Sequence, residues 1–322
     1  MSEPLLEVTG LKTYFFLPPE VIRAVDVVSF SLFRGETLAL VGESGCGKSV
    51  SALSILRLLP HPPAKILSGR IGFRGTDILK LSKEEMRRIR GKEISMIFQE
   101  PMSSLNPLLT VGEQIIEAVL VHLPINKKEA KERAVEMLRK VGIPDPEQRQ
   151  RNFPHELSGG MRQRVMIAMA LICNPSLLIA DEPTTALDVT IQAQVLHLLR
   201  GLQEDSGMAI LLITHDLGMV AEIATSVAVM YAGRIVEGAR AEELFQKRLH
   251  PYTRGLFMSL PQLARTGQRL FSIAGSVPDM ADLPRGCRFW PRCPEVREVC
   301  RESEPELKDV YDGHKVACWL FN

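Results

Sequence analysis

The sequence has 322 residues, of which 45% are hydrophobic and 24% charged, so its length and composition suit one large globular domain or two moderate ones. The formal net charge of +1 gives no broad electrostatic field that would favour nucleic acid or an anionic membrane as a partner. Apolar runs such as Met208–Ile213 are far shorter than the roughly 20 residues that span a bilayer, and Met1–Pro4 does not resemble a signal peptide. We therefore expect a cytoplasmic protein. Its six cysteines are then expected to be thiols or metal ligands.

The first part of the chain reads as β-rich. Three segments suit an antiparallel sheet, and a fourth leads into a glycine-rich loop after the turn at Arg34-Gly35. A helical pattern follows the loop, and two further strands come after it. In chain order the segments are Leu5–Val8, Thr13–Phe16, Val25–Phe33, Glu36–Val41, the helix Ser51–Leu59, and the strands Gly69–Ile78 and Ile94–Phe98.

Residues 42–49 fit the pattern G-x-x-x-x-G-K-S/T between a strand and a helix, which is the context that this motif requires. Its glycines let successive backbone N–H groups point at a phosphate chain, and the helix N-terminus adds partial positive charge. Lys48 can reach the β- and γ-phosphates, and Ser49 can hold Mg²⁺. A chance glycine-rich turn is the alternative, and the complete match argues against it. The predicted nucleotide-binding residues here are Gly42, Ser44, Gly45, Cys46, Gly47, Lys48, Ser49 and Val50.

Cys46 lies near the helix N-terminus and beside Lys48. Both features favour the thiolate form of a cysteine. We therefore expect its thiol to react with alkylating agents and to be protected by ATP.

The middle of the chain changes to a helical period. Apolar residues recur at helical spacing from Val111 to about Arg151, which predicts a helical insert within an α/β core. Near His250 the composition becomes rich in Pro, Arg and Cys and loses periodicity, so we place a domain boundary between about 245 and 260. The elements expected between the insert and this boundary are the helix Gly160–Ile172, the buried strand Leu177–Ala180, the helix Ile191–Leu202 and the strand Ala209–Thr214.

Two acids stand at the end of the buried strand. Asp181 and Glu182 after a phosphate loop suit Mg²⁺-dependent phosphoryl chemistry. Asp181 would lie beside Mg²⁺ or bind it through water, and Glu182 would orient or deprotonate the attacking water. Two acids could also simply start a surface loop, but Pro183–Asp188 follows them directly.

A second anion-binding helix end precedes these acids. Ser158 is a good N-cap, and Gly159 and Gly160 open the N-terminus of a helix. One nucleotide needs one such cradle, so this end is predicted to bind the γ-phosphate held by another subunit. A plain helix cap is the alternative.

These motifs together resemble the ATPase subunit of ABC transporters. The phosphate loop, Gln99, Leu157–Met161, Leu177–Glu182, Ala186–Asp188 and His215 stand in the order and spacing of that family, over about residues 5–245. Met161 departs from the family pattern, because many members carry Gln there. The resemblance implies a P-loop NTPase α/β core with an antiparallel β subdomain and a helical insert at about 103–175, all within residues 1–250. A small Cys-rich extension would then occupy residues 251–322.

The family also implies roles for particular residues. A head-to-tail dimer with a homologous ATPase subunit would sandwich two ATP molecules. Gln99 would contact Mg²⁺ and the attacking water, His215 would contact the γ-phosphate, and Asp188 would run along the dimer seam. Phe15 aligns with the aromatic residue that stacks on adenine, and Tyr14 is the alternative.

The tail resembles the D-type ATPase subunits of dipeptide and oligopeptide importers. It carries His250–Thr253, Ser259–Pro261, Val277-Pro278 and Pro284–Cys287, and Glu100–Pro107 fits the same subfamily. This implies peptide import with two membrane permeases and an extracytoplasmic peptide-binding protein, at the cytoplasmic face of the membrane. Nickel and glutathione importers are close relatives.

A soluble ABC protein acting on DNA or ribosomes would belong to a different class, which the single cassette and the absence of a basic surplus disfavour. A redox- or iron-sensing ATPase is a third possibility.

Four cysteines fall in the tail with the spacing C-x5-C-x6-C-x17-C: Cys287, Cys293, Cys300 and Cys318. Four cysteines in a short Pro-rich segment with few apolar residues suggest one metal centre. The tight pairs typical of Zn²⁺ sites are absent, and the tail resembles peptide-importer extensions that carry clusters. We therefore expect a 4Fe–4S cluster, with Zn²⁺ as the alternative. Four reduced structural thiols are a third possibility.

Overall fold

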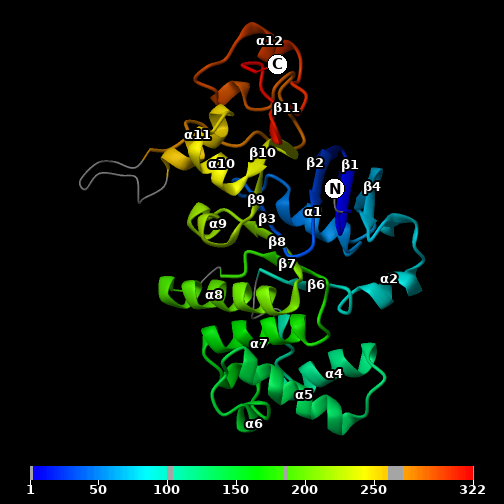
Figure 1. Ribbon diagram of the computed structural model, residues 1–322. Helices are drawn as coiled ribbons and strands as arrows, with labels where there is room; N and C mark the ends of the chain where they lie inside the picture. The colour runs from blue at the N-terminus through cyan, green and yellow to red at the C-terminus, as the bar shows by residue number, and fades with distance from the viewer. Residues whose placement is uncertain (1–2, 100–103, 185–187, 260–270, 322) are drawn as a thin grey trace. The chain divides into compact units, whose positions relative to one another are not determined.

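The computed structural model describes residues 3–99, 104–184, 188–259 and 271–321. Parts of three patterns noted above, Glu100–Ser103, Ala186-Leu187 and Leu260-Pro261, lie outside the described residues. The chain divides into two compact units (Figure 1). One comprises residues 1–79 and 213–322, and the other comprises residues 80–212.

The first unit begins with a four-stranded antiparallel sheet in the order β2-β1-β4-β5. The two strands expected at Leu5–Val8 and Thr13–Phe16 form one continuous strand. Gly10 has a φ of 57°, and the pairing register shifts after Val8, so a bulge absorbs the irregularity without ending the strand. The strands are β1 (Leu6–Leu17), β2 (Glu20–Leu32), β4 (Ala64–Phe73) and β5 (Thr76–Asp77).

Five other strands of this unit follow one another in the order β11-β12-β10-β9-β3. All residues of β3 are buried, as its continuous apolar run requires, and β3 pairs with β9 in parallel. The strands are β3 (Thr37–Val41), β9 (Ser226–Tyr231), β10 (Arg234–Arg240), β11 (Lys308–Tyr311) and β12 (His314–Val316). The helices are α1 (Lys48–Ile55), α9 (Leu217–Ile223), α10 (Ala241–Gln246), α11 (Pro251–Met258) and α12 (Glu298–Glu302). Short 3-10 turns occur at η4 (Trp290–Arg292) and at η1 (Ile78–Lys80), whose last residue belongs to the second unit.

The tail has more structure than its composition predicts. Strand β12 pairs with β10 and so extends the sheet, and Phe289 is buried in one hydrophobic cluster with Tyr231 and Tyr252. Strands of three and four residues are too short for a periodic pattern to reveal them. The part of the tail that the structure describes therefore shares a core with the strands of the first unit, and a separate domain at 251–322 stays a prediction.

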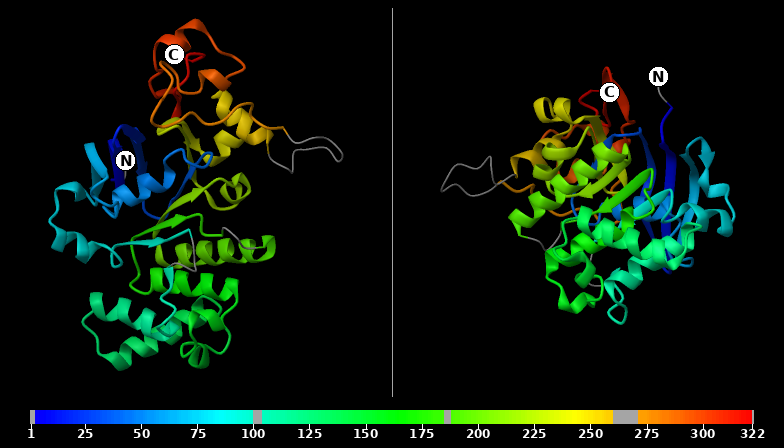
Figure 2. Two further views of the ribbon diagram at one scale, coloured as in Figure 1. Left: turned by 180° about the vertical axis from the view of Figure 1, so that it is seen from behind. Right: turned by 60° about the horizontal axis from the view of Figure 1, so that its bottom comes forward.

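The second unit contains three strands and the helical insert. Its strands stand in the order β8-β7-β6, and β6 and β7 are parallel. Helices α4, α5 and α7 lie side by side in all views (Figures 1 and 2). The strands are β6 (Ile94–Ile97), β7 (Leu177–Asp181) and β8 (Ala209–Thr214), whose last two residues belong to the first unit. The helices are α2 (Lys83–Ile89), α4 (Val111–His122), α5 (Lys127–Lys140), α6 (Pro146–Arg149), α7 (Gly159–Leu171) and α8 (Val189–Ser206), with a 3-10 turn η2 (Pro154–Glu156).

Local sequence rules explain the insert well. Thr110 and Asn126 begin α4 and α5 with complete capping boxes, because each is followed three residues later by a Glu that bonds back to it. The buried faces of the two helices carry Ile115, Val119, Ala134 and similar residues at helical spacing. Across the described residues, no helix combines the length and the apolar character needed to cross a membrane.

Candidate nucleotide-binding site

The predicted phosphate loop connects β3 to α1 in the first unit. Gly45 and Gly47 have φ values of 80° and 105°, a region that favours glycine. A Cβ atom at Gly47 would lie 2.1 Å from the carbonyl oxygen of Ala24, and one at Gly42 would lie 2.2 Å from that of Met230. The loop is therefore held against the backbone on two sides, and only glycine permits that approach at these positions.

Lys48 is the first residue of α1 and is almost fully buried. Its Nζ donates hydrogen bonds to the carbonyl oxygens of Gly42 at 2.7 Å and Glu43 at 3.0 Å. The ammonium thus lies over the loop, where it and the N-terminal end of the helix both favour an anion. Ser49 is half-buried, and Ser44 is exposed.

Cys46 differs from its sequence-based prediction. Its side chain is 0% exposed, and burial raises the pKa of the thiol even though the Lys48 ammonium, 3.7 Å from Sγ, opposes that rise. Burial thus encloses Cys46 and favours its neutral thiol, which contradicts the expectation of a reactive thiolate.

The predicted catalytic carboxylate lies in the second unit, directly after β7. Glu182 has a φ of 46°, a left-handed conformation that is uncommon for a residue with a side chain and that clusters at functional sites. Gln99, which follows β6, donates through Nε2 to Oε2 of Glu182 at 2.9 Å. Asp181 is buried at the end of β7, and Gln163 of α7 donates to the carbonyl oxygen of Pro183. Neighbouring parallel strands thus bring Gln99 and Glu182 together.

The second predicted anion site begins α7 as expected. The Ser158 hydroxyl accepts a hydrogen bond from the backbone N–H of Met161 at 3.3 Å, and the residue is exposed. Open space surrounds Gly159, whereas Gly160 packs against a side chain of α8. Asp188 caps α8 in the same manner, with its Oδ1 accepting a backbone N–H at 2.9 Å. Both caps are equally compatible with a plain structural role.

Phe15 and Tyr14 point to opposite faces of β1. The Tyr14 hydroxyl donates to Asp26 at 2.9 Å, whereas the Thr13 hydroxyl bonds to that of Ser54 in α1 at 2.9 Å. Because side chains alternate along a strand, Phe15 shares the Thr13 face, which is turned toward the helix of the phosphate loop. This favours Phe15 over Tyr14 as the aromatic residue near a nucleotide.

His215 follows β8 and is exposed. The next residue, Asp216, caps α9 by accepting the backbone N–H of Gly218 at 2.7 Å. The position just past a strand end agrees with the sequence-based expectation, and contact with a γ-phosphate stays a prediction.

Two family models match the chain, one described as ABC transporter over residues 25–185 and one described as Oligopeptide/dipeptide transporter, C-terminal region over residues 236–300. A probable peptide ABC transporter ATP-binding protein of Sinorhizobium fredii is 55% identical over 100% of this chain and 96% of its own length. This chain belongs to the ABC transporter ATPase family. The oligopeptide transport ATP-binding protein AppD of Bacillus subtilis is 54% identical over 98% of this chain and 97% of its own.

Solved structures agree with this ABC ATPase assignment. A dimeric post-hydrolysis structure of the ATP-binding cassette MJ0796, bound to ADP and Pi, has a TM-score of 0.66. It is 27% identical and covers 73% of this chain and 98% of its own. The fold class is therefore an α/β ABC ATPase cassette with mixed sheets, and the chain is an ATPase.

The predicted metal centre of this ABC ATPase is not supported. Among the residues that the structure describes, no group of three or more His, Cys, Asp or Glu side chains is arranged to hold a metal ion. Burial raises the pKa of Cys287 to about 12 and that of Cys318 to about 11, and it also raises the pKa of Cys293. Burial thus favours neutral thiols in the metal-free chain, and a metal ion would have to displace their protons on binding.

Sequence reasoning missed the polar contacts that the extension makes with the phosphate loop. Tyr252 and Arg292 both bond to Glu43, the residue after the first loop glycine. The tail motif His250–Thr253 contains Tyr252, but nothing in that motif identifies its partner. An acid inside a phosphate-binding loop was the one available signal, because its charge opposes the ligand.

Proposed function

We propose that this ABC ATPase hydrolyses ATP to power the import of dipeptides or oligopeptides. Peptide cargo is supported by the C-terminal region model that matches residues 236–300 and by relatives named for peptide transport. The hydrolytic step is carried by one observation, the hydrogen bond between Gln99 and the strained Glu182 at the end of a buried strand.

In this proposal the phosphate loop binds the triphosphate through its backbone N–H groups and Lys48. Ser49 and Gln99 are the proposed Mg²⁺ ligands, since each taken by itself offers a neutral oxygen, and the Gln99 amide nitrogen is already used by Glu182. A Mg²⁺ ion held there would supply positive charge that offsets the negative charge of the phosphates. Glu182 orients or deprotonates the attacking water, and Asp181 lies beside Mg²⁺ or binds it through water. His215 contacts the γ-phosphate, and Phe15 stacks on adenine.

The shared site of a head-to-tail dimer is the second part of the proposal. Ser158 and Gly159 are exposed at the start of α7, and nothing lies within 4 Å of a Cβ placed on Gly159, so another subunit's phosphate has room to approach. With Gly160 and Asp188 they would complete the site of a homologous ATPase. MJ0796, which is similar in fold, was solved as a dimer.

The helical insert is proposed to dock on the permeases. Leu108 and Val121 have exposed fractions of 82% and 69%, the highest among the large hydrophobic side chains that the structure describes. Exposed apolar side chains of this kind mark surfaces that bind a partner. The chain would then lie at the cytoplasmic face of the membrane with two permeases and an extracytoplasmic peptide-binding protein. Retention of permeases in a pull-down supports this assignment, and retention of ribosomes or DNA instead contradicts it.

For the extension we keep the 4Fe–4S cluster as a proposal, with Zn²⁺ as its competitor. Backbone groups of Phe289, Glu295 and Leu320 bond to Cys287, Cys293 and Cys318, respectively, and Cys300 accepts the Arg297 N–H at 3.5 Å. Backbone hydrogen bonds to sulfur are a feature of cluster sites. Anaerobically purified protein should contain about four irons per chain. Stoichiometric zinc without iron would show a zinc site in place of the cluster. A protein that contains neither iron nor zinc would refute the proposed metal centre.

The hydrolysis proposal is tested with Glu182→Gln, which keeps side-chain shape and removes the base. Turnover should fall by at least about a hundredfold while ATP binding is retained. Glu84→Gln, a change to an exposed carboxylate on α2, serves as the matched control and should leave turnover unchanged. A hydrolysis rate near that of the wild-type protein in Glu182→Gln would contradict the catalytic role assigned to Glu182.

A further inference from the structure

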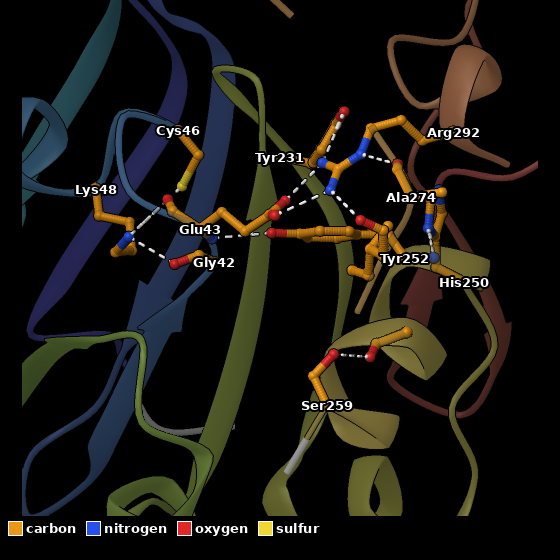
Figure 3. Close-up of polar contacts among 12 residues, drawn as sticks. Gly42, Glu43, Cys46, Lys48, Tyr231, His250, Tyr252, Ser259, Ala274 and Arg292 are labelled. Atoms are coloured by element: carbon orange, nitrogen blue, oxygen red, sulfur yellow. Dashed lines mark hydrogen bonds and ion pairs between the residues drawn. The ribbon is translucent and has the colours of Figure 1, made fainter. Parts of the chain in front are cut away.

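Glu43 of the phosphate loop is held at both ends by residues of the C-terminal segment (Figure 3). Its backbone N–H donates to the Tyr252 hydroxyl at 2.9 Å. Its carboxylate pairs with Arg292 in a two-pronged contact, with Nη1–Oε2 at 2.7 Å and Nη2–Oε1 at 3.0 Å. The Arg292 side chain is 4% exposed and that of Glu43 is 30% exposed, so solvent screens this ion pair only in part.

Contacts outside the phosphate loop also hold the Arg292 side chain in place. Its Nε donates to the carbonyl oxygen of Ala274 at 3.0 Å, and its guanidinium lies over the rings of Tyr231 and Phe289. Tyr231, Tyr252 and Phe289 pack against one another with ring centroids 4.6–5.4 Å apart. The fork of Arg292 and the hydroxyl of Tyr252 are thus pre-organised by one aromatic cluster.

A second route reaches the loop from the same segment. Arg288 donates to the carbonyl oxygen of Ala232 at 2.5 Å, and the adjacent Gly233 N–H donates to the carbonyl oxygen of Cys46 at 2.9 Å. Arg288 follows Cys287, and Arg292 precedes Cys293. The segment that carries the tail cysteines therefore contacts the phosphate loop directly at Glu43, and it reaches Cys46 only through the backbone of Ala232 and Gly233.

We propose that Arg292 and Tyr252 are positioning residues for ATP binding. They hold the phosphate loop in its observed conformation. Arg292 also neutralises the negative charge of the Glu43 carboxylate, which would otherwise repel the triphosphate. Through them the order of the cysteine-bearing extension controls the affinity of the cassette for ATP. This inference rests on the proposed ATP binding at the loop, and it assigns the extension a direct influence on that site.

The test measures ATP affinity and turnover separately. Arg292→Ala should weaken ATP binding about tenfold, because an uncompensated carboxylate remains beside the phosphates, while turnover at saturating ATP stays near wild type. Glu43→Gln in the Arg292→Ala background should restore most of the affinity. Added salt should shrink the Arg292→Ala defect, since an electrostatic effect at a partly exposed carboxylate is screened. Arg285→Ala, at an exposed arginine of the same segment, is the matched control and should bind as wild type.

Tyr252→Phe removes one hydroxyl and no packing, so it keeps the proposal testable if Arg292→Ala folds poorly. It should weaken ATP binding about fivefold, the loss of one hydrogen bond. Wild-type affinity in both single variants would overturn the proposal, as would failure of Glu43→Gln to restore affinity or a loss confined to turnover. Absence of ATP binding in the wild-type protein would instead refute the nucleotide site itself.

Discussion

His250 makes the stability of the C-terminal segment depend on pH in a direction that the structure fixes. Its side chain is buried and caps α11, with Nδ1 accepting the Tyr252 N–H at 3.0 Å. An accepting Nδ1 requires an unprotonated nitrogen. Burial, aided by the charge of Arg254, lowers the pKa of His250 from 6.5 to about 3.

The magnitude follows from the two pKa values. The folded-state pKa lies below the unfolded one, so the stabilisation is present above pH 6.5 and is lost as pH falls toward 3. At pH 5.5, one unit below the unfolded pKa, the free energy of unfolding should have fallen by about 1.4 kcal/mol through this residue. His250→Asn removes the titration and keeps a good N-cap.

The assay is urea unfolding at pH 7.5 and 5.5, followed by the fluorescence of Trp290 and Trp319, the two tryptophans of the chain, which both report on the tail. The wild-type protein should lose about 1.4 kcal/mol more than His250→Asn between these pH values. If the free energy of unfolding fell equally in the two proteins between these pH values, the conclusion that His250 is buried and neutral would be refuted.

Three further predictions concern the nucleotide loop and the shared site. Gly47→Ala should weaken ATP binding far more than Gly45→Ala, because of these two positions only Gly47 has backbone within reach of an added Cβ atom. Equal losses of ATP affinity in binding titrations would contradict the loop geometry. Alkylation of Cys46, followed by mass spectrometry, should be slow with or without ATP, and fast labelling that ATP suppresses would contradict its burial. Mixing inactive Ser158→Arg and Lys48→Ala proteins, if the chain homodimerises, should restore part of the ATPase rate through one intact composite site, and no recovery in proven dimers would argue against shared sites.

Local rules predicted a large part of the site. The strand, glycine loop and helix around Lys48 were predictable because the motif needs left-handed backbone that glycine supplies. The cap at Ser158 and the acids after β7 likewise depend on residues a few positions apart. Such short-range relationships can be predicted from the sequence, because the residues involved lie only a few positions apart.

Long-range pairs were not predictable from the same sequence. Glu43 and Arg292 lie 249 residues apart, and Gln99 and Glu182 lie 83 apart, so no periodicity connects them. The presence of four cysteines in a short Pro-rich tail predicted a metal centre, whereas their burial, which favours neutral thiols, depends on the fold. Burial likewise reversed the prediction for Cys46, since desolvation outweighs a neighbouring ammonium.

The central claim is that ATP hydrolysis by this chain drives peptide import. The direct measurement is uptake of a radiolabelled oligopeptide by proteoliposomes that contain the two permeases, the binding protein and the ATPase pair. Wild-type protein should give ATP-dependent accumulation of the peptide, and Glu182→Gln should abolish it. Equal accumulation with wild-type and Glu182→Gln protein, or ATP hydrolysis without any peptide uptake, would contradict the account.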